Sequence, residues 1–258
     1  MSSIISSIEN GVGIIRFNRP DKFNSFNREM ALALQGVLDD FAADKTVRAL
    51  LITAEGKAFC AGQDLAEAID DFGPGIQRIV REHYNPIIKK IRSIEKPVVC
   101  AVNGVAAGAG ANIALACDIV LAGNSASFIQ AFSKIGLVPD SGGTFFLPRL
   151  IGFQRASALM MLGDKVSASD ALQMGMIYRV YDDAQLLNES MAIAVVLANM
   201  PTKGIALTKQ LINESMFNNI DAQLDKEELL QAAAGKTYDY QEGVNAFLQK
   251  RKPVFKGE

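Results

Sequence analysis

A long apolar stretch near the middle of the chain limits most strongly what this sequence can fold into. Residues 98–123 read VVCAVNGVAAGAGANIALACDIVLAG, which is long enough to cross a bilayer. The stretch also contains Asn103, Asn112, Asp118 and several glycines, and polar residues are costly in the centre of a membrane span. We therefore predict a strand, a loop, a helix and a second strand, all buried in a globular core.

The segments on both sides of this stretch alternate between strand and helix patterns. The runs VGIIRFN and ALLITAE are typical of strands, and residues 76–95 carry isoleucines at helical spacing. After residue 142 the helical patterns dominate. This order predicts an α/β core that is followed by a mainly helical C-terminal part.

Polar residues that favour helix N-termini mark where several helices should begin. Asn27 precedes the run REMALALQGVLDDFAAD, whose apolar residues recur on one helical face. Ser167, Asp183 and Asp221 are further capping signals. GKAFCAGQDL reads as a loop that turns into a helix, and DYQEGVNAFLQKRKPVFKGE as an amphipathic helix with a basic tail.

Composition excludes several classes of protein. A chain of 258 residues, 49% hydrophobic, is long enough for one large domain or one domain with a smaller appendage. Its net charge of −2 gives no electrostatic footprint for nucleic acid or for an anionic membrane. We expect neither as a partner.

Cysteine usage and the N-terminal segment point to a reducing compartment. Cys60, Cys100 and Cys117 form no C-x-x-C pair, so a disulfide framework or a metal site is not expected. The N-terminus lacks a basic region followed by an apolar run, which a signal peptide requires. The sequence predicts a soluble, cytoplasmic protein. The single histidine, His83, lies in a helical run and is interpreted as a packing or surface residue.

Two loops of small residues run from a strand into a helix. The first contains Cys60 to Asp64, and the second is GAGANI at 108–113. The second lacks the third glycine of a dinucleotide-binding turn, because residue 113 is Ile. Each loop could be merely a tight connection. Alternatively, the two loops could present main-chain N–H groups that converge on one carbonyl oxygen.

These loops belong to a set of motifs that resembles the crotonase (enoyl-CoA hydratase/isomerase) superfamily. The matching stretches are NRPDKFNSFN, KAFCAGQDL, KPVVCAVNGVAAGAGANIALACDIVLA, KIGLVPDSGGTFFLPRLIG and DYQEGVNAFLQKRKPVF, and they cover the chain nearly end to end. The resemblance implies the crotonase fold, a spiral of ββα units. It further implies a core over residues 1–195, with the CoA and acyl site, and a helical region over 196–258 for trimer assembly.

The resemblance also implies roles for individual residues. The backbone N–H groups of Gln63 and Ala109 match the oxyanion hole of the superfamily. Hydratases of the superfamily carry two glutamates, and this chain has Asn112 and Phe132 at those places. Asp140 matches the catalytic aspartate of superfamily isomerases. From the residues alone, Asp140 could instead be a helix N-cap.

Within the superfamily, the motifs AGQDL, NGVAAGAGA, AFSKIGLVPDSGGT and YNPIIKKI resemble the group of isomerases that act on ring-epoxidised phenylacetyl-CoA. Such enzymes convert the epoxide to an oxepin and also shift enoyl-CoA double bonds. Coenzyme A would be part of the substrate, and no separate cofactor is implied. A homotrimer or a dimer of trimers is expected. The residues implied to contact the substrate are Lys22, Phe23, Ala61, Asp64, Leu65, Asn112, Phe132, Phe145, Phe247 and Lys250.

Two other functions stay open at this point. One is an enoyl-CoA hydratase that uses an acid not yet identified. The other is a non-catalytic subunit that binds acyl-CoA, because an intact fold does not guarantee chemistry.

Overall fold

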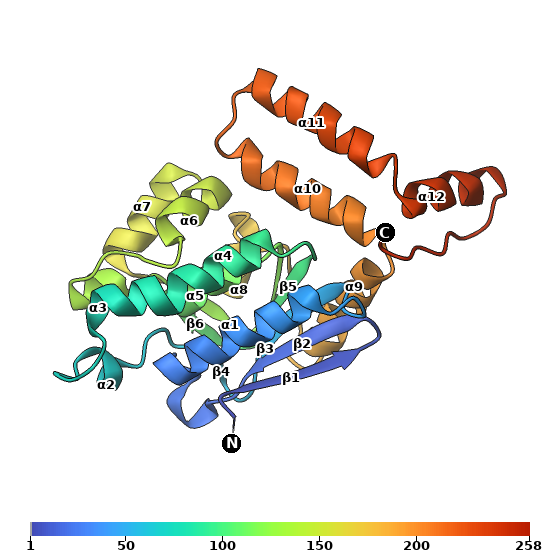
Figure 1. The fold of residues 1–258 in the computed structure, drawn as a ribbon. Coiled ribbons are helices and arrows are strands. Elements are labelled where there is room, and N and C mark those ends of the chain that lie inside the picture. The colour runs from blue at the N-terminus through green and yellow to red at the C-terminus, as the bar shows by residue number, and fades with distance from the viewer. Residues whose placement is uncertain (1) are drawn as a thin grey trace.

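The computed structural model describes residues 2–258, and a six-stranded sheet forms its centre (Figure 1). The first two strands pair antiparallel, and all the other neighbours in this sheet are parallel. In spatial order the strands are β1 (Ile4–Glu9), β2 (Val12–Phe17), β3 (Ala49–Ala54), β5 (Val98–Val102), β7 (Ile119–Gly123) and β10 (Arg179–Tyr181).

A second sheet is made of short strands, most of which lie in the chain between a strand of the large sheet and a helix. Its order is β4 (Ala58–Cys60), β6 (Val105–Ala107), β8 (Ser127–Ile129) and β9 (Lys165–Ser167). Along the chain, β3 leads to β4, β5 to β6 and β7 to β8, and each pair is followed by a helical segment. This repeated strand–strand–helix order is the spiral of ββα units, so the predicted fold is confirmed.

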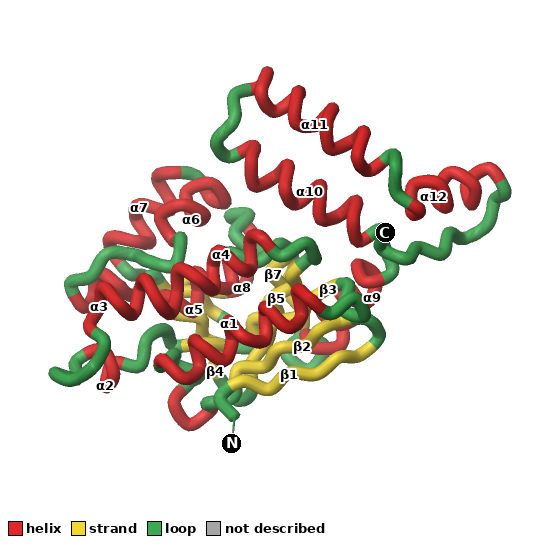
Figure 2. The backbone as a smooth tube through the Cα atoms, in the orientation of Figure 1, coloured by secondary structure: helices red, strands yellow, loops and turns green. Residues whose placement is uncertain are grey.

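Most of the helices lie around the two sheets, and the last three lie apart from them, as Figure 2 shows. In chain order, the helices are α1 (Arg28–Ala43), α2 (Leu65–Ala68), α3 (Gly75–Arg78), α4 (Asn85–Ser93), α5 (Ala109–Leu115), α6 (Gly143–Ile151), α7 (Phe153–Leu162), α8 (Ala168–Gln173), α9 (Leu186–Ala198), α10 (Thr202–Ser215), α11 (Ile220–Ala234) and α12 (Tyr238–Leu248). A π-helical turn, Ile79–Tyr84, joins α3 to α4, so the predicted helix over 76–95 is one continuous helical run. Single 3₁₀ turns occupy Pro20–Lys22 and Ala131–Ile135.

The large sheet has an apolar core on each face because side chains alternate along a strand. Ile15 and Leu50 belong to the larger core, which includes residues of α1 and α4. Their strand neighbours Ile14 and Leu51 belong to a smaller core that α9 covers. Strands buried on both faces must be apolar at every position, which explains the continuous hydrophobic runs in the sequence.

The last three helices extend away from the sheets (Figure 1). The boundary predicted at residue 195 falls inside α9, which still packs on the large sheet. The buried Lys209 ammonium holds α10 to the core through a 2.8 Å ion pair with Asp118. Within residues 2–258, no single helix is long and apolar enough to cross a membrane. The helices α9 and α10 reach the length and composition of a membrane span only when they are taken together, and they are bent by 104° relative to each other.

Two of the predicted helix caps are correct and two are wrong. The side chains of Asn27 and Ser167 accept N–H groups at the starts of α1 and α8. Asp183 does not cap α9, because its carboxylate accepts the backbone N–H of Ser125 at 3.0 Å. Asn219 caps α11, and Asp221 lies in the first turn of that helix instead.

The apolar stretch over residues 98–123 forms β5, β6, α5 and β7, inside the core as predicted. The predicted loop between strand and helix contains the short strand β6. The segment GKAFCAGQDL likewise contains the short strand β4 before its loop. Cys60, Cys100 and Cys117 are buried free thiols.

Candidate active site

The first small-residue loop connects β4 to α2. Gly62 has a φ of +93°, which an L side chain rarely adopts, and Asp64 caps α2 through the Ala66 N–H. On one side of the loop, the Phe26 N–H donates to the Gly62 carbonyl at 2.7 Å and the Asp64 N–H donates to the Phe26 carbonyl at 2.8 Å. Because polar groups alternate along an extended chain, the Gln63 N–H between them points to the opposite side.

The second loop connects β6 to α5. Gly108, with a φ of +53°, donates its N–H to the Ile129 carbonyl at 2.8 Å. Ala109 is the first residue of α5, so its N–H has no partner within the helix. Within residues 2–258, the N–H groups of Gln63 and Ala109 donate to no acceptor.

The two loops touch each other. A methyl group on Gly62 would lie 3.8 Å from the Ala109 nitrogen, and one on Gly110 would lie 2.5 Å from the Cys60 carbonyl oxygen. Only glycine allows the start of α5 to approach the first loop this closely. The structure thus brings together the two N–H groups that were expected to converge, which favours the donor interpretation of the loops.

Asp140 lies in the loop before α6 and does not cap that helix. The residue at the N-cap position is Gly142, and no side chain caps α6, so the alternative interpretation of Asp140 is wrong. Instead the Asp140 carboxylate accepts the Ser141 hydroxyl at 2.8 Å. Burial raises the pKa of the Asp140 carboxyl above its ordinary value, and the bond from Ser141 partly opposes this rise.

Asn112 connects the loop that carries Asp140 to the second small-residue loop. Its side-chain N–H donates to the Asp140 carbonyl at 2.8 Å, its side-chain oxygen accepts from Gln130 at 2.8 Å, and its backbone N–H donates to Gly108. Asn112 is 1% exposed, so both ends of its amide are used inside the protein. The structure therefore places Asn112 as a support of the Asp140 loop rather than as a surface that a substrate would contact.

Phe132 gives the second loop an apolar neighbour. It is buried, and its ring would lie 3.6 Å from a methyl group on Gly108. Neither Phe132 nor Asn112 offers a carboxylate, so Asp140 is the acid that the arrangement provides beside α5. An isolated carboxylate with a raised pKa is suited to taking up and returning one proton.

Comparisons with known proteins identify the family. The family model described as enoyl-CoA hydratase/isomerase matches residues 7–258. This chain belongs to the enoyl-CoA hydratase/isomerase family. The 1,2-epoxyphenylacetyl-CoA isomerase of Escherichia coli (strain K12) is 48% identical over 100% of both chains.

Other family members are similar over nearly the whole chain. A probable enoyl-CoA hydratase of Rhodobacter capsulatus is 41% identical over 97% of this chain and 96% of that protein. The crystal structure of an enoyl-CoA hydratase from Bacillus anthracis superposes with a TM-score of 0.93, at 31% identity, covering 99% of this chain and 100% of that one. The chain is an enzyme of this family.

In this enoyl-CoA hydratase/isomerase, the residues expected to contact CoA separate into two groups. Lys22, Phe23, Ala61 and Leu65 are exposed, and the Ala61 N–H donates to the Phe23 carbonyl at 3.0 Å, so they form one rim beside the first loop. Asp64 belongs to the same loop, but its carboxylate pairs with Arg19 at 3.0 Å.

The second group lies elsewhere. Phe247 is in α12 and Lys250 follows it, across the molecule from α2 (Figure 1). Phe145 was expected in the acyl lining, but its ring stacks on Phe217 with centroids 5.4 Å apart, and the Arg149 guanidinium covers it. The structure does not bring Phe145, Phe247 or Lys250 to the loops within one chain.

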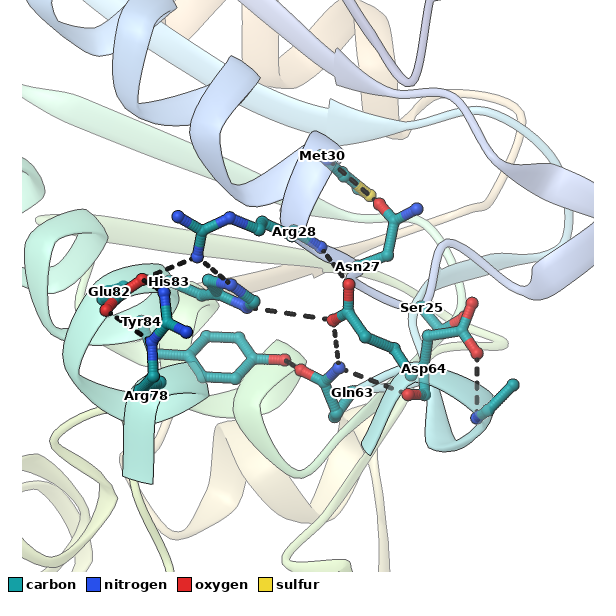
Figure 3. A network of polar contacts seen from close by, with 12 residues as sticks. Ser25, Asn27, Arg28, Met30, Gln63, Asp64, Arg78, Glu82, His83 and Tyr84 are labelled. Carbon is teal, nitrogen blue, oxygen red and sulfur yellow. Dashed lines mark hydrogen bonds and ion pairs between the residues drawn. The ribbon is translucent and has the colours of Figure 1, made fainter. Parts of the chain in front are cut away.

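Sequence reasoning did not identify the polar residues around Gln63. Tyr84 and Glu67 bind its side chain. Tyr84, which Figure 3 shows beside Gln63, opens the YNPIIKKI stretch that carries the resemblance, but the stretch gave it no chemical role, and Glu67 lies in none of the matching motifs. Burial raises the pKa of the Tyr84 hydroxyl well above its ordinary value, so the hydroxyl keeps its proton. Tyr84 thus contacts the first loop through the Gln63 side chain. The available signals were its place at the start of YNPIIKKI and its position two residues before Pro86 in a helical run.

Proposed function

We propose that this enzyme is an acyl-CoA isomerase in which Asp140 is the base. The observation that carries the proposal is a half-buried carboxyl with a raised pKa, in a loop that Asn112 ties to α5, together with two main-chain N–H groups that have no acceptor in the described chain. Asp140 removes a proton from C2 of an enoyl thioester. The N–H groups of Gln63 and Ala109 hold the oxygen of the resulting dienolate. Asp140 then returns the proton at C4. In the reverse direction, Asp140 removes the proton from C4 and returns it at C2.

The two donors supply most of the stabilisation in this scheme. Loss of one preorganised oxyanion donor typically costs about 3–4 kcal/mol of transition-state stabilisation. The donors act where charge develops, so they lower the barrier more than they strengthen substrate binding. A raised pKa brings the carboxyl closer to the operating pH, which favours transfer in both directions.

The substrate class follows from similarity and from the lining of the site. We infer a CoA thioester, with 1,2-epoxyphenylacetyl-CoA as the preferred substrate and linear 3-enoyl-CoA as a second one, because the 48% identical relative carries that name. The Phe132 ring beside Gly108 suits an aromatic acyl group. The exposed rim around Lys22 and Phe23 is the proposed contact for the CoA nucleotide. CoA enters as part of the substrate, so no separate cofactor is proposed.

We also propose that the enzyme works as a homotrimer or a dimer of trimers. The helices α10–α12 extend from the core and expose large apolar side chains, among them Phe217, Leu224, Leu229 and Phe247. Burying such surface against a second copy is the ordinary use of an exposed apolar patch. Phe247 and Lys250 would then reach the site of a neighbouring copy. The three free thiols fit the cytoplasm.

Three substrates test the proposal. Purified enzyme is incubated separately with 1,2-epoxyphenylacetyl-CoA, 3-hexenoyl-CoA and crotonyl-CoA. The proposal predicts isomerisation of the first two and little formation of 3-hydroxybutyryl-CoA from the third. Rapid hydration of crotonyl-CoA would instead identify a hydratase. Tight binding by calorimetry without turnover of any of the three would identify a non-catalytic subunit.

A further inference from the structure

The side chain of Gln63 is held at both ends by other residues. Its oxygen accepts the Tyr84 hydroxyl at 2.8 Å, as Figure 3 shows. Its nitrogen donates to the Glu67 carboxylate at 2.9 Å. The same nitrogen also reaches the Asp64 carbonyl at 3.2 Å. A surface glutamine ordinarily moves freely between rotamers, so an amide with three partners marks a restrained residue.

We call Tyr84 and Glu67 together the clamp on Gln63. Tyr84 belongs to the hydrophobic core. Tyr84 is 1% exposed and packs against Phe26, with ring centroids 6.1 Å apart. It is the last residue of the π-helical turn between α3 and α4. Such turns widen a helix locally and are frequent at functional sites. The hydroxyl of Tyr84 is therefore a fixed donor with no other partner among the described residues than Gln63.

The Glu67 end is anchored to the N-terminus of α1. The second oxygen of Glu67 accepts the backbone N–H of Arg28 at 2.8 Å. His83 faces the same carboxylate, with Nδ1 3.9 Å away. The Arg28 guanidinium lies 3.3 Å from His83 Nε2 and cannot accept a proton, so Nε2 accepts and Nδ1 carries the hydrogen toward Glu67. Burial lowers the pKa of His83, which keeps this ring neutral.

We infer that Tyr84 and Glu67 are positioning residues that act through the Gln63 side chain to fix the direction of the Gln63 backbone N–H. This inference rests on the proposed function, in which that N–H holds the dienolate oxygen. The Gly62 carbonyl belongs to the same peptide unit as this N–H and accepts the Phe26 N–H at 2.7 Å, so main-chain bonds already hold one side of the loop. An oxyanion donor must lie within a few tenths of an ångström of its ideal place to be effective. The clamp adds a side-chain restraint from the other side of the loop to these main-chain bonds.

A double-mutant cycle tests whether Tyr84 acts through Gln63. Tyr84→Phe removes the hydroxyl and keeps the ring, and Gln63→Ala removes the amide and keeps the backbone N–H. Each single variant should lose kcat on the order of tenfold, less than deletion of an oxyanion donor, while binding of hexanoyl-CoA changes by less than about twofold. The double variant should be no slower than the slower single variant. Multiplied losses, or an unchanged kcat in Tyr84→Phe, would overturn the inference.

A spectroscopic measurement separates this inference from the proposed function. Hexanoyl-CoA labelled with carbon-13 at the thioester carbonyl cannot isomerise, and the carbonyl stretch of the bound compound reports polarisation by the oxyanion hole. Binding to the wild type should lower this frequency, and Tyr84→Phe should remove at least half of the shift. An equal shift in both proteins would contradict the clamp even if the wild type isomerises. Failure of the wild type to isomerise would contradict only the proposed function.

Two further variants complete the design. Tyr178→Phe is the matched control, because Tyr178 is an exposed tyrosine next to β10, and it should keep the wild-type kcat and carbonyl shift. Should Tyr84→Phe fail to fold, Glu67→Gln loosens the other end of the clamp at a half-buried side chain. It should lower kcat several-fold with binding preserved. A wild-type kcat in Glu67→Gln would count against the inference.

Discussion

The hydroxyl of Ser141 donates a 2.8 Å hydrogen bond to the carboxylate of Asp140. Burial raises the pKa of Asp140, and this bond works in the opposite direction because it stabilises the ionised form. A base must be ionised before it can accept a proton, so the bond keeps Asp140 active at lower pH. Ser141 is itself 2% exposed and has a φ of +51°.

Ser141→Ala should move the acidic limb of the kcat/KM profile to higher pH. Without the hydroxyl, burial raises the pKa of Asp140 unopposed, so a larger fraction of the base is protonated at a given acidic pH. Ser141→Gly is the matched variant: it also lacks the hydroxyl but relaxes the positive φ. Both variants should show the same shift, and Ser141→Gly should unfold at higher urea concentration than Ser141→Ala. A shift toward lower pH would contradict the assignment of Asp140 as the base.

Asn112→Ala should lower both stability and activity. The substitution leaves the Asp140 carbonyl and the Gln130 amide without their partner inside the protein. Leaving a buried polar group unsatisfied costs about 1–3 kcal/mol in the free energy of unfolding. Urea unfolding measures this loss, and kcat should fall because the loop that carries Asp140 is loosened. Asn245→Ala, at an exposed position of α12, should change neither.

Gly110→Ala should separate the two loops. The new methyl group would lie 2.5 Å from the Cys60 carbonyl oxygen, so α5 must shift away from the first loop. Isomerase activity should fall by orders of magnitude and the free energy of unfolding should decrease. Gly36→Ala is the control, because Gly36 is exposed in α1 with open space around it. It should stabilise the protein by up to about 1 kcal/mol. Full activity in Gly110→Ala would contradict the converging donors.

Much of the fold could be predicted because its signals are local. Asn27 and Ser167 are capping residues whose effect depends on the next three positions, and the buried strands β3, β5 and β7 are continuous apolar runs. Strands of three residues such as β6 and β8 carry no period that a sequence could reveal. They exist because ladder partners from distant segments pair with them.

The candidate site was predictable at Gln63, Ala109 and Asp140, since motifs identify these residues. The residues that support them were not, because their partners are distant in sequence. Tyr84 meets Gln63 only through the π-helical turn. Gln130 meets Asn112 only because β8, which Gln130 follows, pairs with β6, the strand that leads into α5. Asp183 looks like a cap in sequence, yet it binds Ser125 from another part of the chain. Tertiary contacts decide such cases.

Asp140→Asn should leave the folded state at least as stable as the wild type at neutral pH. A carboxyl whose folded pKa is raised above its unfolded value of 3.8 favours folding when protonated, and this advantage is lost as pH rises through the folded pKa. Asparagine carries no charge to desolvate. Unfolding by urea at pH 7 measures the difference. A large destabilisation would mean that the Asp140 carboxylate has a structural role.

The central claim is that Asp140 moves the proton, and turnover of 3-hexenoyl-CoA by Asp140→Asn tests it most directly. Formation of the conjugated 2-enoyl thioester is followed by its absorbance, and hexanoyl-CoA binding is measured on the same sample. We expect the rate of double-bond migration to fall by at least about a thousandfold, with acyl-CoA binding and stability retained. A variant that isomerises 3-hexenoyl-CoA at the wild-type rate would contradict the account.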